Sequence, residues 1–458
     1  MVFKNLLFAF LMVLSLRLIS QPLELSYQEA IAKAIKDNIS LKQQKNNLNI
    51  FQANKAASIA QYTPTISAGG NAVLSTGRVF DQDKGAIVDD TRRNLSANIG
   101  ANLTLFNGFR RINTLKRANF NMDMQEQTIE SREQELIYEV SLNYQQILLD
   151  QQILKIREEN LKSQQDQLAQ IQALLDEGLR PVTDFYQQEA LVKEAEVDLI
   201  QMENTLRSDI AALTQLLQID PGAELRVSSP DWKVEELLLL EKDLDKLYQI
   251  ALMNRPDYKA MQYQTMVAEK DLKIAKSGYY PRLNLFYAYS SSFSSARTMF
   301  NEVSQQNEQI PFNDQFFDQN INRIFGLSFS IPIYDGLNTN TQVVASRVQN
   351  DNLKLQLQDE KRNIFANVQN SYLNFEAAKK NYQAAQSRLR AAEKSVELQK
   401  ESYRLGVADF VAVSQANSTY VDAASAIAQA KGELFFSKII LDYFTGTIGQ
   451  NLICASLK

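Results

Sequence analysis

Histidine is absent from this sequence of 458 residues, and cysteine occurs once, at Cys454. Histidine is the commonest general base and metal ligand near neutral pH, so His-based triads and His-ligated zinc sites are excluded. One cysteine forms neither an intrachain disulfide nor a thiolate metal site. The net charge of -5 also lacks the basic excess of nucleic-acid-binding proteins. We therefore expect no enzyme activity, no cofactor, no metal site and no nucleic-acid partner.

Glycine and proline are scarce as well, with 15 and 9 copies, so few residues interrupt long helices. Residues 1–20 resemble a secretory signal peptide, with Lys4 before the apolar run 6–16 and a cleavage point after Ser20. A membrane anchor is the alternative, but this run is short for a membrane span. Beyond it, no apolar run of about 20 residues occurs in the sequence. The exported chain therefore either stays soluble in the periplasm or crosses a membrane as β-structure.

The rest of the chain contains an internal sequence repeat. Residues near 26–70 match residues near 243–287 at an offset of 217, and from Gly108 onward the offset is 228. The offset increases because the second copy contains a longer polar stretch, at residues 291–322. We expect this stretch to be an exposed loop. The repeat divides the chain into a signal peptide (1–20), a first repeat (21–218), an inter-repeat equatorial segment (219–241), a second repeat (242–446) and a C-terminal equatorial tail (447–458).

A long helix is predicted in each repeat. No Gly or Pro occurs between Gly108 and Gly178, and apolar or aromatic residues recur there every seven positions. A sustained seven-residue period is typical of supercoiled helices packed along a seam. The two matching stripes are Val140, Ile147, Leu154, Leu161, Leu168 and Leu175, and Val368, Phe375, Tyr382, Leu389, Val396 and Tyr403.

Four shorter helices complete the helical part of the prediction. They cover residues 26–60, 184–218, 244–278 and 412–445, and the first begins with a capping box formed by Ser26 and Glu29. Two short helices placed end to end match one long helix, whose length is about 100 Å for about 65 residues. We expect each long helix to lie antiparallel to two short ones, with the equatorial segment beside their junction.

Four segments alternate between apolar and polar residues and predict strands, at 65–75, 94–105, 282–293 and 323–333. Each has about the length that a tilted strand needs to cross a bilayer. Aromatic residues at their inner ends fit an interfacial girdle: Tyr62, Phe106, Tyr279, Tyr280 and Tyr334. A soluble antiparallel sheet with one buried face explains the alternation equally well.

Four strands are too few to close a membrane barrel, and an open sheet edge is not tolerated in lipid. A membrane-spanning form must therefore share one barrel among several copies. Three copies would supply twelve strands, although the strand count alone does not fix that number.

The repeated order of elements resembles the TolC-like outer membrane efflux family across the mature sequence. The resemblance is based on four features that occur in both repeats. They are the Tyr-Pro junctions ending at Pro64 and Pro281, the strand pairs, the turns at Gly108 and Gly336, and the long helix with its return helix. The resemblance implies a mainly α-helical homotrimer whose twelve-stranded barrel, four strands per protomer, is continued by a coiled-coil tunnel. It also implies a passive exit duct in the outer membrane, extending into the periplasm, for drugs, small toxic compounds or secreted protein. The implied partners are outer-membrane lipid, a periplasmic membrane-fusion adaptor and an inner-membrane transporter of a tripartite pump or type I secretion system.

In the family, a Gly flanked by apolar residues meets the adaptor at both periplasmic turns. The matching positions are Gly178 and Leu179 in the first repeat, and Leu405, Gly406 and Val407 in the second. The alternative is that these glycines only end the long helices in a left-handed conformation.

The family also often places acidic residues six and nine positions after the second Gly, where they form a pore constriction. Here these positions are Ala412 and Gln415, so the acidic pair is not carried over. The first repeat has Asp184 and Gln187 at the corresponding positions, and Asp409 lies three residues after Gly406. These four side chains, Asp184, Gln187, Asp409 and Gln415, are the constriction candidates. Alternatively, Asp184 caps the return helix.

Two other functions compete with the duct. A periplasmic coiled-coil scaffold would use the same helices without transport. A hydrolase would need paired carboxylates in a pocket, whereas pairs such as Glu158 and Glu159 occupy positions expected on solvated helix faces.

Overall fold

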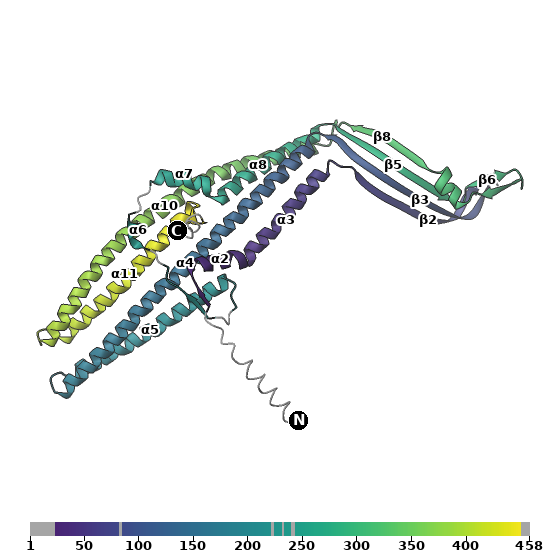
Figure 1. Cartoon of the computed structure of the whole chain (residues 1–458). Helices are drawn as coiled ribbons and strands as arrows, with labels where there is room; N and C mark the ends of the chain where they lie inside the picture. The colour runs from purple at the N-terminus through teal and green to yellow at the C-terminus, as the bar shows by residue number, and fades with distance from the viewer. Residues whose placement is uncertain (1–22, 82–84, 221–223, 231–232, 240–242, 450–458) are drawn as a thin grey trace, which may run out of the picture. The chain divides into compact units, whose positions relative to one another are not determined.

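The computed structural model describes residues 23–81, 85–220, 224–230, 233–239 and 243–449. The predicted signal peptide, Cys454 and most of the predicted C-terminal tail lie outside these ranges. The chain forms two compact units (Figure 1). The helical unit lies within Met1–Asn46, Glu126–Lys259 and Gln358–Lys458, and the sheet unit within Asn47–Gln125 and Ala260–Leu357. Each unit thus takes segments from both sequence repeats.

The two predicted long helices are confirmed as α4 (Arg110–Asp176) and α10 (Asn338–Arg404), each of 67 residues. Each is followed by a return helix of 35 residues, α5 (Val182–Leu216) or α11 (Phe410–Phe444). Asn338 lies 228 residues after Arg110, and Phe410 lies 228 after Val182, so the helices recur with the offset read from the sequence. None of the twelve seam residues is exposed, which confirms the heptad pattern.

The first short helix was predicted to be continuous over 26–60. In the structure it is divided into α2 (Tyr27–Asp37) and α3 (Ile39–Ala60). Asn38 interrupts it with an extended ψ of 124°. The buried Asn38 side chain accepts a hydrogen bond from the Leu41 amide at 3.0 Å, as an N-cap residue does. The prediction missed this break because periodicity alone does not reveal a local cap.

The matching helix of the second repeat, predicted over 244–278, is divided in the same way. Here α7 (Leu244–Asn254) and α8 (Pro256–Lys276) are separated by Arg255, whose ψ is 116°. A proline disfavours the helical conformation of the residue before it and is well accommodated in the first turn of a helix. Pro256 was therefore a signal for this break that the prediction did not use.

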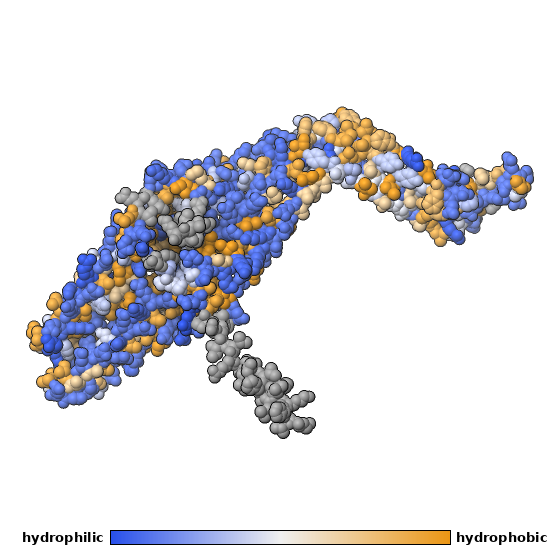
Figure 2. Space-filling view, in the orientation of Figure 1, coloured by the Kyte–Doolittle hydropathy of each residue, from blue (hydrophilic) through white to orange (hydrophobic). Residues whose placement is uncertain are grey.

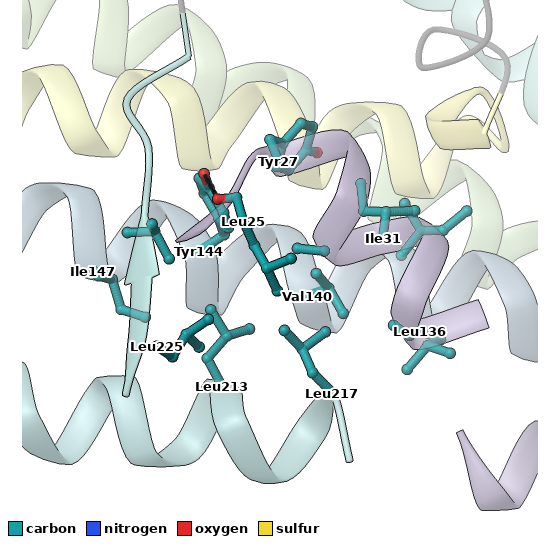
Figure 3. Packing of buried hydrophobic residues seen from close by; sticks show 14 of the residues in the cluster. Leu25, Tyr27, Ile31, Leu136, Val140, Tyr144, Ile147, Leu213, Leu217 and Leu225 are labelled. Atoms are coloured by element: carbon teal, nitrogen blue, oxygen red, sulfur yellow. Dashed lines mark hydrogen bonds between the residues drawn. The ribbon is translucent and has the colours of Figure 1, made fainter. Parts of the chain in front are cut away.

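The core of the helical unit surrounds a short parallel strand pair, β1 (Leu23–Leu25) with β4 (Leu225–Val227) (Figure 3). Tyr144 of α4 is fully buried there, and its hydroxyl donates to the backbone carbonyl oxygens of Leu25 at 3.0 Å and Ser228 at 2.6 Å. The short helix α6 (Val234–Leu238) follows β4. The described residues of the equatorial segment thus contain both a strand and a helix.

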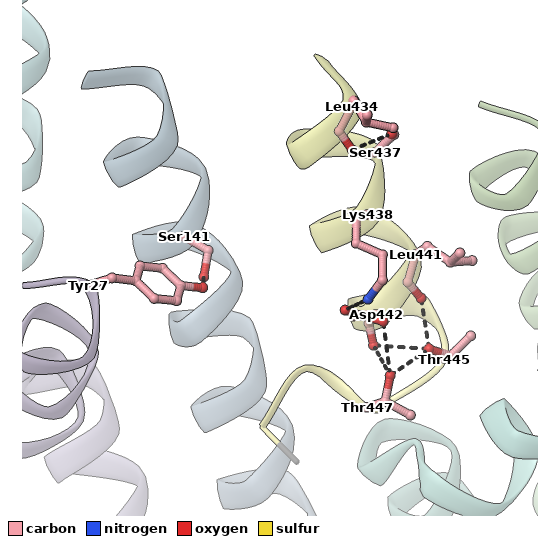
Figure 4. A network of polar contacts seen from close by, with 9 residues as sticks. All are labelled: Tyr27, Ser141, Leu434, Ser437, Lys438, Leu441, Asp442, Thr445 and Thr447. Atoms are coloured by element: carbon pink, nitrogen blue, oxygen red, sulfur yellow. Dashed lines mark hydrogen bonds and ion pairs between the residues drawn. The ribbon is translucent and has the colours of Figure 1, made fainter. Parts of the chain in front are cut away.

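Capping and buried polar contacts fix the ends of the helices around this core. The predicted capping box is confirmed, because the Ser26 side chain accepts from the Glu29 amide and the Glu29 carboxylate accepts from the Ser26 amide. At the end of α11, Lys438 forms an ion pair with Asp442, and the Thr445 hydroxyl donates to the Leu441 carbonyl oxygen at 2.8 Å (Figure 4). The contacts at the end of α11 satisfy polar groups that would otherwise be buried without partners.

The sheet unit contains an antiparallel sheet in the order β2-β3-β5-β8. Its strands are β2 (Thr65–Asp81), β3 (Ala86–Asn107), β5 (Arg282–Ser294) and β8 (Asn322–Ser330). The first two strands are longer than the predicted 65–75 and 94–105, because their ladder continues beyond the apolar alternation through polar pairs such as Thr76 with Thr91.

The register places the alternating apolar residues of all four strands on one face, as predicted. Directly paired residues share a face, and Ile66, Ala101, Tyr287 and Phe325 form one such row across the sheet. Within the described residues, β2 and β8 have no partner strand on their outer edges. The sheet therefore has one apolar face and two open edges.

The polar stretch 291–322 is more ordered than the predicted loop. After the end of β5 it forms a hairpin, β6 (Thr298–Asn301) with β7 (Gln306–Gln309). Two short turns of helix follow, α9 (Phe312–Asp314) and the π-helical η2 (Gln315–Gln319). Aromatic side chains and buried Gln315 hold these turns against β5. Composition alone did not indicate that these turns pack on the strand.

Gly108 joins β3 to α4, and Gly336 is the matching glycine of the second repeat. Replacing Gly108 should cost more stability than replacing Gly336. The φ of Gly108 is 67°, and an added Cβ would lie 2.6 Å from the Ser277 carbonyl oxygen. Gly336 has φ 66° in the second repeat, but nothing lies within 4 Å of its added Cβ. We expect Gly336→Ala to cost about 1–2 kcal/mol, for the left-handed backbone alone. Gly108→Ala should cost about 1–3 kcal/mol more, from overpacking.

Thermal unfolding of the two detergent-purified variants, followed by helical circular dichroism, checks this order. Equal decreases in the unfolding midpoint would contradict the assigned close contact at Gly108.

Candidate functional site

The turn between α4 and α5 ends the first long helix with a left-handed glycine. Gly178 has φ 74°, its amide donates to the Leu175 carbonyl oxygen at 2.9 Å, and the Leu179 amide donates to the Leu174 carbonyl oxygen at 2.8 Å. These two hydrogen bonds define a Schellman motif. The expected helix-ending role of Gly178 is confirmed, and the motif leaves the Leu179 side chain 65% exposed.

The turn between α10 and α11 repeats this geometry. Gly406 has φ 77°, its amide donates to the Tyr403 carbonyl oxygen at 3.0 Å, and the Val407 amide donates to the Ser402 carbonyl oxygen at 2.9 Å. The flanking apolar side chains are again exposed, Leu405 by 63% and Val407 by 83%. Each turn therefore presents apolar side chains to its surroundings from a fixed backbone.

Arg180 connects the two turns. Its guanidinium lies 3.9 Å from the centre of the Tyr403 ring, and its Nη2 donates to the Tyr403 carbonyl oxygen at 3.0 Å. Tyr403 belongs to a buried cluster with Ile171, Phe410 and Val413, which come from both helical hairpins. A groove of about 850 Å³ opens beside this contact, and residues of both turns, Leu179 and Gly406, line it.

Sequence reasoning did not identify Arg180. An arginine in a helix-connecting turn is usually solvated, and its partner Tyr403 lies 223 residues further along the chain. The only available signal was Tyr403 itself, the last residue of the second heptad stripe.

The four constriction candidates are not equivalent. The alternative that Asp184 caps the return helix is wrong, because Pro181 occupies the N-cap position and makes no side-chain cap hydrogen bond. Asp184 lies instead in the first turn of α5, half-buried and close to the Tyr403 hydroxyl. Burial raises the pKa of that hydroxyl, Arg180 lowers it, and the Asp184 charge raises it again.

The other three candidates are all exposed. Asp409 is the N-cap of α11 and accepts a hydrogen bond from the Ala412 amide at 2.8 Å. Gln187 lies on the surface of α5 and Gln415 on that of α11. Of the four, Asp184 is the one that the described structure places beside the contact between the two turns.

Sequence reasoning also missed a buried carboxyl group in α4, which lies well before the turn that ends this helix. Asp150 is 2% exposed, and Gln146 Nε2 donates to its Oδ1 at 2.9 Å. Burial raises the pKa of Asp150 to about 7, Asp209 of α5 raises it as well, and the hydrogen bond from Gln146 opposes both. A single Asp in a helix is ordinarily solvated, so sequence position alone does not indicate that Asp150 is buried near Asp209.

Within the described residues, no three acidic or cysteine side chains lie close enough together to hold a metal ion. Of the helices described, none combines the length and apolar composition that a membrane crossing requires.

The match to a known protein family covers both sequence repeats. The sequence model of a family described as "Outer membrane efflux protein" matches residues 30–217 and 247–447. The outer membrane efflux protein BepC of Brucella suis is 24% identical over 327 residues, 70% of this chain and 63% of that protein. The solvent efflux pump outer membrane protein SrpC of Pseudomonas putida is 27% identical over 169 residues, 37% of this chain and 35% of that protein. These alignments span less than two thirds of either relative.

Solved structures match over more of the chain. CusC, described as forming a transmembrane channel, has 17% sequence identity and a TM-score of 0.79, with 92% of both chains covered. The outer membrane protein VceC of Vibrio cholerae has 13% identity and a TM-score of 0.78, with 92% of this chain and 96% of VceC covered. This likeness confirms the predicted fold class.

The buried Asp150 carboxyl should make stability depend on pH. Its pKa in the folded protein is higher than that of an exposed Asp, so the neutral form is favoured by folding and ionisation opposes it. Stability should therefore fall as pH rises from about 4 through about 7. We expect Asp150→Asn to flatten this dependence and to stabilise the protein at pH 8, on the order of 2 kcal/mol.

The unfolding midpoint measured between pH 5 and 8 tests this expectation. Asp198→Asn is the matched control, because Asp198 is partly exposed and paired with Arg157 at 3.2 Å. A wild-type pH dependence that survives in Asp150→Asn would assign it to other groups.

Proposed function

Because this chain belongs to the outer membrane efflux protein family, its place in the cell is the outer membrane, and we propose that it is the exit duct of a tripartite export system. In this role it passively conducts drugs, small toxic compounds or secreted protein out of the periplasm and performs no catalytic step. Family membership confirms the resemblance recognised in the repeated motifs. The duct, its cargo and its partners are the proposal.

The sheet carries this proposal. Its apolar face is exposed, with Ile66, Phe325 and Leu327 exposed by 73%, 71% and 63%, and apolar residues are visible over it in Figure 2. An apolar surface of this kind is stable when lipid covers it. Both sheet edges lack partner strands in the described residues, so lipid exposure requires other copies to pair with them. We propose three copies and a twelve-stranded barrel, with the helical units of the three copies enclosing a periplasmic tunnel.

The two turns fit the docking of a periplasmic adaptor, which in turn meets an inner-membrane transporter. Gly178 and Gly406 hold the turns in matching conformations, and Leu179, Leu405 and Val407 present apolar side chains. The groove beside them is bordered by both turns, so one partner segment can contact the two together. This arrangement supports docking beyond the helix-ending role of the glycines.

The contact between the turns supports a constriction at the same end of the helical unit. Arg180 joins the two hairpins through the Tyr403 ring and carbonyl oxygen, and Asp184 places a negative charge beside them. In three copies around one axis, such contacts would hold a narrow entrance closed. Gln187, Asp409 and Gln415 then remain candidates for its polar lining.

A coiled-coil scaffold is the other function predicted from sequence. Extraction separates the two, because a duct needs detergent whereas a scaffold leaves with a salt or osmotic wash. The exposed apolar face of the sheet favours the duct.

Disrupting the turn should abolish export without unfolding the protein. We expect the double variant Leu405→Asp/Val407→Asp to leave a strain as drug-sensitive as deletion of the gene, because two exposed apolar contacts become charged. Val303→Asp is the matched control, since Val303 is 95% exposed in the β6–β7 turn. Minimum inhibitory concentrations, read beside the amount of assembled protein, give the result. Full resistance in the double variant would rule out docking through this turn.

Removing the Arg180 contact should open the entrance. A cation–π contact contributes about 1–2 kcal/mol, so Arg180→Ala should raise the open-to-closed ratio by roughly five- to thirtyfold. Planar-bilayer conductance of the purified protein measures it. Arg157→Ala is the control, because it removes an ion pair with Asp198 inside one hairpin. Equal conductance in both variants would remove Arg180 from the constriction.

A further inference from the structure

The outer end of β5 extends beyond its partner β8. The last pair joins Ser290 to Asn322, whereas β5 continues to Ser294 and remains paired with β3 on its other side. The backbone at this end is satisfied by side chains. Gln315 Oε1 accepts from the Ser294 amide and its Nε2 donates to the Ser294 carbonyl oxygen, both at 3.1 Å. Asn320 Nδ2 donates to the Ser292 carbonyl oxygen at 2.7 Å.

These two amide side chains therefore replace the missing end of β8. An amide carries a donor and an acceptor in the same spacing as a backbone peptide group, so it can extend a ladder by one position. Gln315 is fully buried, which fits a sealing role rather than a chance surface contact.

The same segment, Phe312–Gln319, carries three aromatic side chains and is here called the outer aromatic segment. The Phe312 ring lies 5.2 Å from that of Phe293 on β5 and 5.1 Å from that of Phe316. The Phe317 ring lies 5.2 Å from that of Phe316 and is 65% exposed. Four aromatic rings, three of them from this segment, thus gather at one end of the sheet.

The register shows on which face these rings lie. Phe293 is paired with Leu95, so both belong to the apolar face of the sheet. The Ser291 hydroxyl, on the same face, donates to the Phe316 carbonyl oxygen. The outer aromatic segment therefore lies over the apolar face, whereas a neighbouring copy would pair at the edges.

The apolar face ends at this level. On β3 the residue that follows Leu95 on that face toward the loop is Arg93, and beyond it Thr76 is paired with Thr91. From Leu283 to Phe293 strand β5 rises about 34 Å at ~3.4 Å per residue. A tilt of about 40–45° converts this into about 25 Å, the height of the apolar band of outer-membrane barrels.

We propose that the outer aromatic segment is a lipid anchor at the outer boundary of the membrane. Aromatic side chains are favoured where acyl chains meet head groups, and the end of the apolar band puts Phe317 at that depth. Gln315 and Asn320 seal the adjoining strand end, which would otherwise leave backbone groups unpaired beside lipid. This inference rests on the proposed function, because it requires the sheet to lie in a bilayer.

Tryptophan fluorescence in vesicles tests the anchor. The sequence contains one tryptophan, Trp232, so Phe317→Trp in a Trp232→Phe background gives a single reporter. The full-length protein is reconstituted into phosphatidylcholine vesicles whose acyl chains carry bromine close to either the head group or the chain end. Leu327→Trp on the apolar face of β8 and Met299→Trp in β6, a position 61% exposed, are made in the same background.

We expect quenching of Phe317→Trp to be severalfold stronger than that of Met299→Trp, and strongest with bromine close to the head group. Leu327→Trp should be quenched by the deeper bromine as well. If Leu327→Trp is quenched but Phe317→Trp is not, the sheet is in the bilayer and the anchor is wrong. Equal quenching at Met299→Trp would also overturn it, because the segment would not mark a boundary. If none is quenched, the proposed membrane duct itself fails.

Discussion

The structure depends on the pairing of backbone amide and carbonyl groups at the two edges of one sheet. Water satisfies an open edge, whereas the hydrocarbon of a bilayer does not, and each unpaired group there costs several kcal/mol. In the described residues, β2 and β8 carry such edges beside an exposed apolar face. Lipid can therefore cover the face only when further copies pair with the edges. The same requirement explains why the amide groups of Gln315 and Asn320 replace β8 where it stops short.

The helical unit meets a different constraint. Its long helices are held to their return helices by heptad seams, but the seams are interrupted by polar groups such as the Asp150 carboxyl and the pair Gln164–Gln188. Buried polar groups add less to stability than apolar packing, and they require specific partners. In the described residues, the two turns are joined by directional contacts around Tyr403, and the proposed closure would depend on them. A duct needs this combination, because its wall has to stay assembled while its entrance opens.

Much of the fold could be predicted because it is periodic. The heptad stripes, the alternating strands and the two sequence offsets all repeat over many residues, so single exceptions do not obscure them. The breaks at Asn38 and Arg255 were missed because a local cap or one proline overrides the period at a single position. The composition of the polar stretch after β5 predicts a loop, because its order depends on contacts with that strand that composition does not reveal.

The candidate site was less predictable than the fold. The left-handed glycines were evident from their positions after long helices, and their motifs are confirmed. The link through Arg180 joins residues from different repeats, and sequence spacing contains no information on such a contact. Asp184 was open to two interpretations until the backbone showed that Pro181 holds the cap position.

Shared closure of the sheet is the central claim, and the mass of the detergent-extracted particle tests it most directly. Native mass spectrometry, with electron microscopy of the same sample, should give three copies of the processed chain in a hollow, threefold-symmetric particle. A monodisperse single copy, released without detergent, would contradict the account.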